Sequence, residues 1–249
     1  GVNPLARGMA GAILFRSRDF FDDLTEMTSD AALINMSNHS YSFVRGWTRA
    51  IDWGIGSVDT WFADRSVDSI EDSEFGKYEV DTQSLDQLLS DNPNLLSVWA
   101  AANDRGESYI NAHATNEYMT YLTSDPGGVG FTTPGFYLVP NAGVTSAPPA
   151  DGNAGTGFDC LPNMQVSKNS LVVGAVFDVT NDPYALGDVT LAGFSDTGPT
   201  DDGRVKPDVV ANGIGLTSSI ATGNTDYASF SGTSMASPNA CGTAALLVE

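Results

Sequence analysis

The chain has 249 residues, of which 41% are apolar, and its 31 acidic side chains outnumber its 11 basic ones, giving a formal net charge of −20. This charge repels phosphate backbones and excludes nucleic-acid binding, and no apolar run reaches the roughly 18 residues that a membrane span needs. The length fits one large domain, and the acidity favours a secreted, extracellular protein, although no signal peptide is visible in the chain. The oligomeric state is left open.

The first thirty residues predict a strand followed by a helix. The largely apolar run at residues 11–17 is typical of a strand. Residues 19–32 predict an amphipathic helix, with Phe20, Leu24 and Met27 on one face and acidic side chains opposite.

The following elements alternate between strand and helix. Residues 33–37 predict a short strand, and residues 82–90 predict a helix that begins with Ser and Thr and stops at Asn92. The apolar runs at 95–102 and 170–176 are typical of strands buried on both faces. This order predicts right-handed crossovers and an α/β fold with a mostly parallel sheet.

Two stretches depart from the alternation. Residues 41–80 carry three tryptophans among scattered charges, and residues 104–168 are rich in Gly, Pro, Asn and Thr with little periodicity. Loops of that length without structure of their own are uncommon in compact domains. We therefore expect both stretches to be elaborated surface insertions.

The sequence Ser-Gly-Thr-Ser-Met-Ala-Ser-Pro at residues 231–238 is the strongest chemical signal. It places Ser234 between a Gly-Thr turn and a helix of small residues, and Pro238 suits a first helical turn. Unpaired N–H groups at a helix start favour negative charge that develops beside the serine during acyl transfer. Ser234 is therefore the candidate nucleophile.

An oxyanion needs donors aimed at it, and the chain offers two. The backbone N–H of Ser234 supplies one, and Asn103 is the best candidate for the second. Asn103 follows a predicted parallel strand, and ligands of open α/β sheets bind beyond the carboxyl ends of the strands.

Several segments resemble those of the subtilisin-like serine proteases, the subtilases, in the same order and spacing. The segment 231–238 reads as their nucleophile segment does, and residues 33–37 resemble their substrate-binding strand. Residues 101–106 are similar to the segment with the oxyanion asparagine, 171–176 to the strand after the specificity pocket, and 198–211 to the approach to the serine loop.

This resemblance implies a subtilisin-like three-layer fold, in which helices flank a mostly parallel central sheet. Residues 1–249 would form part of a catalytic domain that is incomplete at both ends and carries the insertions. The resemblance also implies hydrolysis of polypeptides through an acyl-enzyme on Ser234, with Asn103 as oxyanion donor and no cofactor required for catalysis. The substrate-binding residues that it implies are Ser37 and Asn38, which would pair with the peptide backbone, Ala100, Ala101 and Ala102, which would wall a pocket, and Thr233.

The general base is the feature that does not fit. Subtilases order their triad as Asp, His and Ser along the chain, so the Asp and His segments would precede Gly1. The chain has two histidines, His39 and His113, and neither lies in a segment that resembles the general-base helix. Because a serine without a base is a weak nucleophile, we expect this chain alone to be inactive.

Two other interpretations remain open. A pseudoprotease, kept as a binding or structural module, would explain the absent triad members, although the intact serine segment and Asn103 favour an enzyme. Sedolisins replace the histidine with a glutamate, but Ser231 and Met235 depart from their serine segment. A histidine base predicts activity at neutral to alkaline pH, whereas a glutamate base predicts activity in strong acid.

The two cysteines, Cys160 and Cys241, do not form a disulfide framework. Cys241 is expected to be a small buried thiol, and a Cys160–Cys241 bridge stays the alternative.

Structural calcium is an expectation that the resemblance to subtilases implies and the acidic loops favour, and no ligands are assigned because no EF-hand pattern is present. The acids that suggest it include Asp178, Asp182, Asp188, Asp201 and Asp202.

Overall fold

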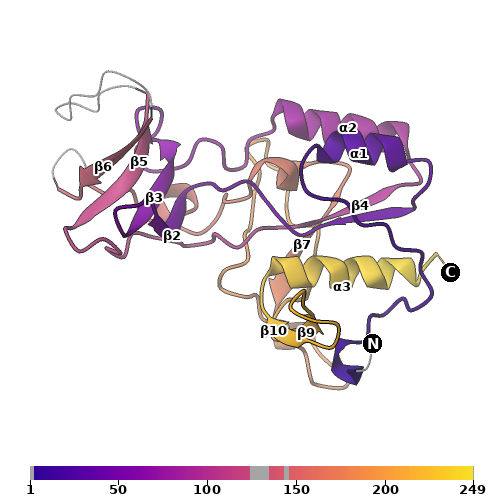
Figure 1. Ribbon diagram of the computed structural model, residues 1–249. Coiled ribbons are helices and arrows are strands. Elements are labelled where there is room, and N and C mark those ends of the chain that lie inside the picture. Colours follow the sequence, from indigo (N-terminus) through magenta and orange to yellow (C-terminus); the bar gives the residue numbers. More distant parts are fainter. Residues whose placement is uncertain (1–2, 124–134, 143–145, 249) are drawn as a thin grey trace.

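The computed structural model describes residues 3–123, 135–142 and 146–248, and arranges them in two lobes with a sheet in each (Figure 1). The lobe on the right of Figure 1 contains the parallel sheet, the three α-helices and the Ser234 segment. No helix among the described residues has the length and apolar character needed to cross a membrane.

The parallel sheet confirms the predicted α/β fold. Its four strands, all parallel, lie in the order β1 (Met36–His39), β4 (Leu96–Ala100), β7 (Leu171–Val176) and β8 (Val209–Asn212). The strands β4 and β7 lie inside the sheet and are the most apolar of the four, as burial on both faces requires. β1 lies at one edge.

Helices cover both faces of this sheet and make three layers. The helices α1 (Asp23–Asp30) and α2 (Val80–Asp91) pack against the face that carries Trp99, and α3 (Thr233–Ala245) packs against the face that carries Val98. Because successive side chains of a strand point to opposite faces, the alternation in β4 fixes which helices each side chain meets.

The second lobe is built from the two stretches expected as insertions. Its four-stranded sheet has the order β2 (Trp47–Asp52), β3 (Ser57–Asp64), β5 (Glu117–Leu122) and β6 (Gly135–Pro140), with β3 and β5 parallel and the other pairs antiparallel. Trp47, Trp61 and Tyr118 are buried at the centre of its core. Large parts of the two stretches therefore fold together as one body, whereas Leu161 and Met164 pack in the core beneath α1 and α2.

The remaining elements are short. An antiparallel pair, β9 (Leu216–Ser219) and β10 (Tyr227–Phe230), leads into α3. The 3₁₀ helices are η1 (Pro4–Ala6), η3 (Asn153–Gly155), η4 (Asn163–Val166) and η5 (Leu186–Asp188).

Three sequence predictions are wrong in detail. Residues 11–17 are not a strand, and Leu14 is fully exposed, because no described segment pairs with them. The first helix begins at Asp23, after Asp22 adopts φ +60°, so Phe20 lies outside it and is exposed. Pro238 lies in the second turn of α3 and not in the first, because the helix already begins at Thr233.

Candidate active site

Ser234 lies in the first turn of α3, as the motif predicts. The N-cap residue Gly232 has no side chain that could accept a hydrogen bond from the first N–H groups of the helix. Ser234 is half-buried and lies beside the end of β1, since its Oγ donates to the carbonyl oxygen of Ser40 at 3.0 Å. The nucleophile candidate therefore lies where the carboxyl ends of the parallel strands meet α3.

Asn103 provides the acceptor that Gly232 lacks. Its Oδ1 accepts from the backbone N of Thr233 at 2.8 Å and from Thr233 Oγ1 at 3.0 Å. The Thr233 hydroxyl also lies 3.2 Å from the carbonyl oxygen of Ala102. These contacts join two predicted motifs that are 130 residues apart in the sequence.

The orientation of Asn103 follows from these contacts. A backbone N–H requires an acceptor, so the oxygen of the amide must face Thr233, and the Nδ2 group must face away from it. Asn103 is exposed, and its Nδ2 donates to no described residue. An amide whose oxygen is held and whose N–H groups are free can donate to a bound ligand.

Neither histidine lies at Ser234. His39 is on the opposite face of the sheet, where its ring stacks on Trp99 at 4.1 Å and its nitrogens contact Tyr41 Oη at 2.6 Å and Ser37 Oγ at 3.0 Å. Burial lowers the pKa of His39 to about 4, so the ring is neutral at pH 7. His113 lies in the second lobe beside Thr115 and Glu117.

The predicted substrate strand β1 presents its two candidate residues differently. The hydroxyl of Ser37 points to the α1 and α2 face and donates to Ser97 Oγ at 3.0 Å. Asn38 is exposed on the α3 side, and its Oδ1 accepts from Ser237 Oγ at 2.8 Å. Because β1 is an edge strand, its backbone is placed to pair with an added peptide, which stays a prediction.

The three alanines predicted to wall a pocket are buried. Ala100, Ala101 and Ala102 are each at most 3% exposed, and Ala101 belongs to the core beneath α1 and α2. An open depression of about 420 Å³ lies elsewhere, at the amino ends of the strands, between residues 31–35 and 91–95. A pocket walled by the alanines therefore stays a prediction.

Buried carboxyl groups surround the loop that follows Asn103. Burial, with Glu107 nearby, raises the pKa of Asp104 to about 7. Asp196 is fully buried, accepts from the backbone N of Arg105 at 2.7 Å, and has a pKa held well above its ordinary value by burial and by the neighbouring Asp104. The raised pKa values favour the protonated forms of both groups, which limits the negative charge beside the site.

No cluster of three or more metal-ligating side chains, suited to a metal ion, occurs among the described residues. The expected calcium therefore has no assigned ligands and stays an expectation. Both cysteines are free thiols, Cys160 buried and Cys241 half-buried, so the alternative of a bridge between them does not hold in this structure.

Ser40 is the neighbour of Ser234 that the sequence predictions missed. Its hydroxyl donates to the carbonyl oxygen of Ser234 at 3.0 Å, while its own carbonyl accepts from the Ser234 hydroxyl. The sequence does contain a pattern that indicates this contact. Asn38 and Ser40 are polar residues at alternate positions, so both point to the same side of the strand.

The sequence is similar to a known protein family and to several characterised proteins. The sequence model of the subtilase family matches residues 22–249. Serine protease AprX of Bacillus subtilis is 34% identical over 112 residues, which are 40% of this chain and 25% of AprX. Pyrolysin of Pyrococcus furiosus is 36% identical over 120 residues, which are 40% of this chain and 8% of pyrolysin.

Among solved structures, the patellamide maturation protease PatA superposes with a TM-score of 0.45 and 19% identity, over 90% of this chain and 48% of that one. The CspB protease of Clostridium perfringens superposes with a TM-score of 0.44 and 15% sequence identity, over 76% of this chain and 55% of that one. The matched part is thus a quarter or less of the two sequence relatives and about half of these structures.

Proposed function

This chain belongs to the subtilase family, and on that premise we propose that it bears the nucleophile and the oxyanion donors of a serine endopeptidase. Ser234 would attack the scissile carbonyl of a polypeptide and form an acyl-enzyme. The observation that carries the proposal is the contact of Asn103 Oδ1 with Thr233 N, which brings the asparagine to the start of the serine helix.

Two donors would stabilise the oxyanion. The Nδ2 group of Asn103 is directed away from Thr233, and the backbone N–H of Ser234 lies in the first helical turn, where N–H groups lack intrahelical acceptors. Donors fixed before the reaction need no reorganisation as charge develops. Thr233 would hold Asn103 in this orientation, and β1 with Ser37 and Asn38 would pair with the peptide.

The base would come from outside these 249 residues. His39 lies across the sheet from α3, and His113 contacts Thr115 and Glu117 in the second lobe. In this proposal the chain by itself does not hydrolyse peptides, and activity requires the Asp and His segments.

The test is to read the gene upstream of the Gly1 codon and to assay the protein with and without any in-frame segment that encodes an Asp and a His motif. With it, we expect peptide hydrolysis and covalent labelling of Ser234 by a fluorophosphonate, both abolished by Ser234→Ala. Asn103→Ala should lower kcat by about 10²–10³, the magnitude known for the side-chain donor of subtilisin, itself a member of this family. Active protein whose label maps to another residue would contradict the proposal.

The second candidate function is a pseudoprotease that acts as a binding or structural module. The observation that favours it is that neither histidine of the chain lies at Ser234. It predicts that no upstream segment restores labelling of Ser234. The acidic composition supports the further proposal of an extracellular protein, which secretion of the full gene product would test.

A further inference from the structure

The helix that carries Ser234 contains a proline where its backbone needs a donor. In an α-helix each N–H donates to the carbonyl four residues earlier. Pro238 has no N–H, so the carbonyl of Ser234 loses its partner within α3. The residue left with an unpaired carbonyl is the candidate nucleophile itself.

A side chain from the end of β1 supplies the missing donor. Ser40 Oγ donates to the carbonyl oxygen of Ser234 at 3.0 Å, and Ser234 Oγ donates to the carbonyl oxygen of Ser40 at the same distance. Ser40 therefore contacts Ser234 at both its backbone and its side chain.

The direction of the Ser40 hydroxyl is also fixed. Asn38 Nδ2 donates to Ser40 Oγ at 3.0 Å, so the Ser40 proton points to the Ser234 carbonyl. Asn38 Oδ1 in turn accepts from Ser237 Oγ at 2.8 Å. This chain of hydrogen bonds leaves α3, passes through β1 and returns to α3, and such chains strengthen their members.

We propose that Ser40 is a positioning residue for Ser234, whose hydroxyl replaces the donor that Pro238 lacks and whose carbonyl sets the direction of the Ser234 hydroxyl. The inference uses the proposed function only in calling Ser234 the nucleophile. It assigns the predicted substrate strand a second role, which is to hold the nucleophile helix.

A double-mutant cycle on the full chain tests it with Ser40→Ala, Pro238→Ala and the pair. In the wild-type background, loss of the Ser40 hydroxyl should lower the folding equilibrium constant about tenfold, as for a partly buried carbonyl that loses its donor. In the Pro238→Ala background the helix regains its N–H, and the same substitution should lower the constant less than about twofold. Ser40→Thr, which keeps a hydroxyl, should restore most of the loss.

A spectroscopic readout separates positioning from a general loss of stability. The ¹³C resonance of the Ser234 carbonyl should move upfield in Ser40→Ala and return in the pair with Pro238→Ala. Ser84→Ala is the matched control, because the Ser84 hydroxyl also donates to a helix carbonyl, that of Val80, at 2.9 Å. Residue 84 is not a proline, so its backbone N–H can still donate to the Val80 carbonyl when the hydroxyl is removed. Ser84→Ala should therefore change neither the stability nor the Ser234 resonance.

Equal losses in the wild-type and Pro238→Ala backgrounds, or an unmoved Ser234 resonance, would overturn the inference. If the Ser40→Ala protein folds only when Pro238→Ala is also present, this result supports the expected coupling. Failure of the proposed function gives a different result. If Ser40→Ala and Pro238→Ala are coupled but Ser234 is never labelled by the fluorophosphonate, only the proposed function is refuted. A labelled Ser234 without coupling refutes this inference alone.

Discussion

Ala102 adopts a backbone conformation that residues with a Cβ avoid. Its φ is +83°, in the region that glycine populates freely, and it lies directly before Asn103. Each such residue costs about 1–2 kcal/mol. The strained backbone at Ala102 turns the chain from β4 towards the start of α3, where the Ala102 carbonyl accepts from Thr233 Oγ1.

Ala102→Gly should therefore stabilise the protein. We expect the free energy of unfolding, measured by urea denaturation, to rise by about 1 kcal/mol because the strain is released. Ala101→Gly is the control: Ala101 is buried and is not among the residues with positive φ, so glycine there should destabilise. Equal effects at the two positions would show that φ at Ala102 is not the cause.

At this scale the sequence points to the candidate reacting groups more readily than to the residues that contact them. Ser234 and Asn103 could be proposed because each lies in a contiguous motif whose residue types suit the chemistry. The capping of Thr233 by Asn103 and the contacts of Ser40 join residues 130 and 194 positions apart. Nothing local in the sequence records such pairings.

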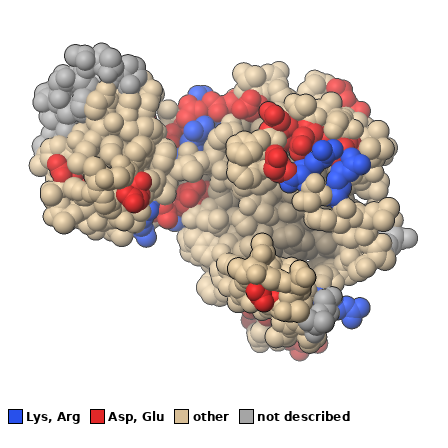
Figure 2. All heavy atoms as spheres, in the orientation of Figure 1, with Lys and Arg blue, Asp and Glu red and all other residues tan. Residues whose placement is uncertain are grey.

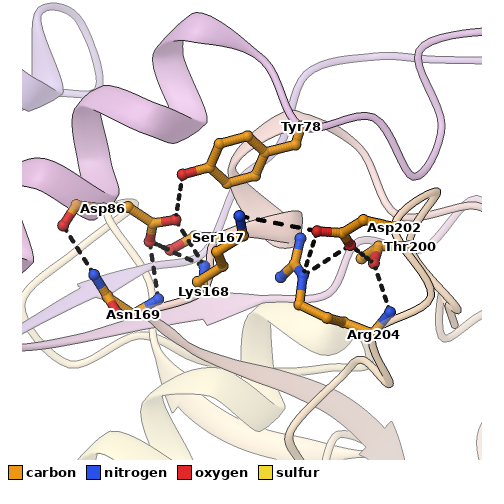
Figure 3. A network of polar contacts seen from close by, with 8 residues as sticks. All are labelled: Tyr78, Asp86, Ser167, Lys168, Asn169, Thr200, Asp202 and Arg204. Carbon is orange, nitrogen blue, oxygen red and sulfur yellow. Dashed lines mark hydrogen bonds and ion pairs between the residues drawn. The ribbon is translucent and has the colours of Figure 1, made fainter.

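Besides its apolar packing on the sheet, α2 is joined to the loop before β7 by the carboxyl group of Asp86. Asp86 accepts from Ser167 Oγ at 2.6 Å and from the backbone N of Asn169 at 2.8 Å, and Tyr78 Oη donates to it at 2.7 Å (Figure 3). Asp86 is buried, and burial opposes ionisation, yet these donors hold its pKa below the ordinary value. The ionised form is therefore the one that attaches α2 to the loop before β7.

Asp86→Ala should destabilise the protein by about 2–3 kcal/mol at pH 7, because several donors lose a charged acceptor. Since the pKa is lower in the folded state, the contribution is present above the unfolded pKa and is lost as pH falls through the folded one. Urea unfolding at pH 7 and pH 3 should thus show a difference between wild type and variant that shrinks in acid. Asp91→Ala, an exposed position at the end of the same helix, should change stability by less than about 0.5 kcal/mol.

The elements that sequence predicts well are those whose partners are implied by the pattern itself. The helix at 82–90 appears as α2 because its apolar spacing and its Asn92 stop agree, although it begins at Val80, before the predicted Ser and Thr start. The apolar run at 11–17 has the composition of a strand but no described partner, and a strand exists only through pairing. Composition therefore could not decide this case.

At the scale of the whole molecule, the second lobe was the feature furthest from prediction. Its sheet joins β3 and β5 in parallel across more than fifty residues, and its core tryptophans come from the first stretch alone. Each stretch lacks a periodicity of its own because each supplies only half of a core. Neither could be read as structured until both were placed together.

The junction between the lobes is rich in acidic side chains, on the surface and in the interior. Figure 2 shows surface acids, with some basic side chains beside them, between the lobes and over the upper part of the parallel-sheet lobe, while the visible face of the second lobe carries few charges. At the junction, Asp151 accepts from the backbone N of Trp47 at 2.9 Å, and burial together with Asp104, Glu107 and Asp72 raises its pKa to about 9. The group that accepts from the Trp47 backbone is thus a carboxyl group whose raised pKa favours its protonated form at pH 7.

Because the folded pKa of Asp151 lies above its ordinary value, the folded state binds the extra proton between about pH 4 and pH 9, and stability falls as pH rises through that window. Each pH unit removes up to about 1.4 kcal/mol per such carboxyl. Asp151→Asn keeps an acceptor for Trp47 without the charge, so its unfolding free energy, measured from pH 5 to pH 9, should decline less than that of wild type. Asp178→Asn, the same substitution at an exposed position outside the buried junction, should leave the slope unchanged. Matching slopes in all three proteins would show that the junction acids do not set the pH dependence.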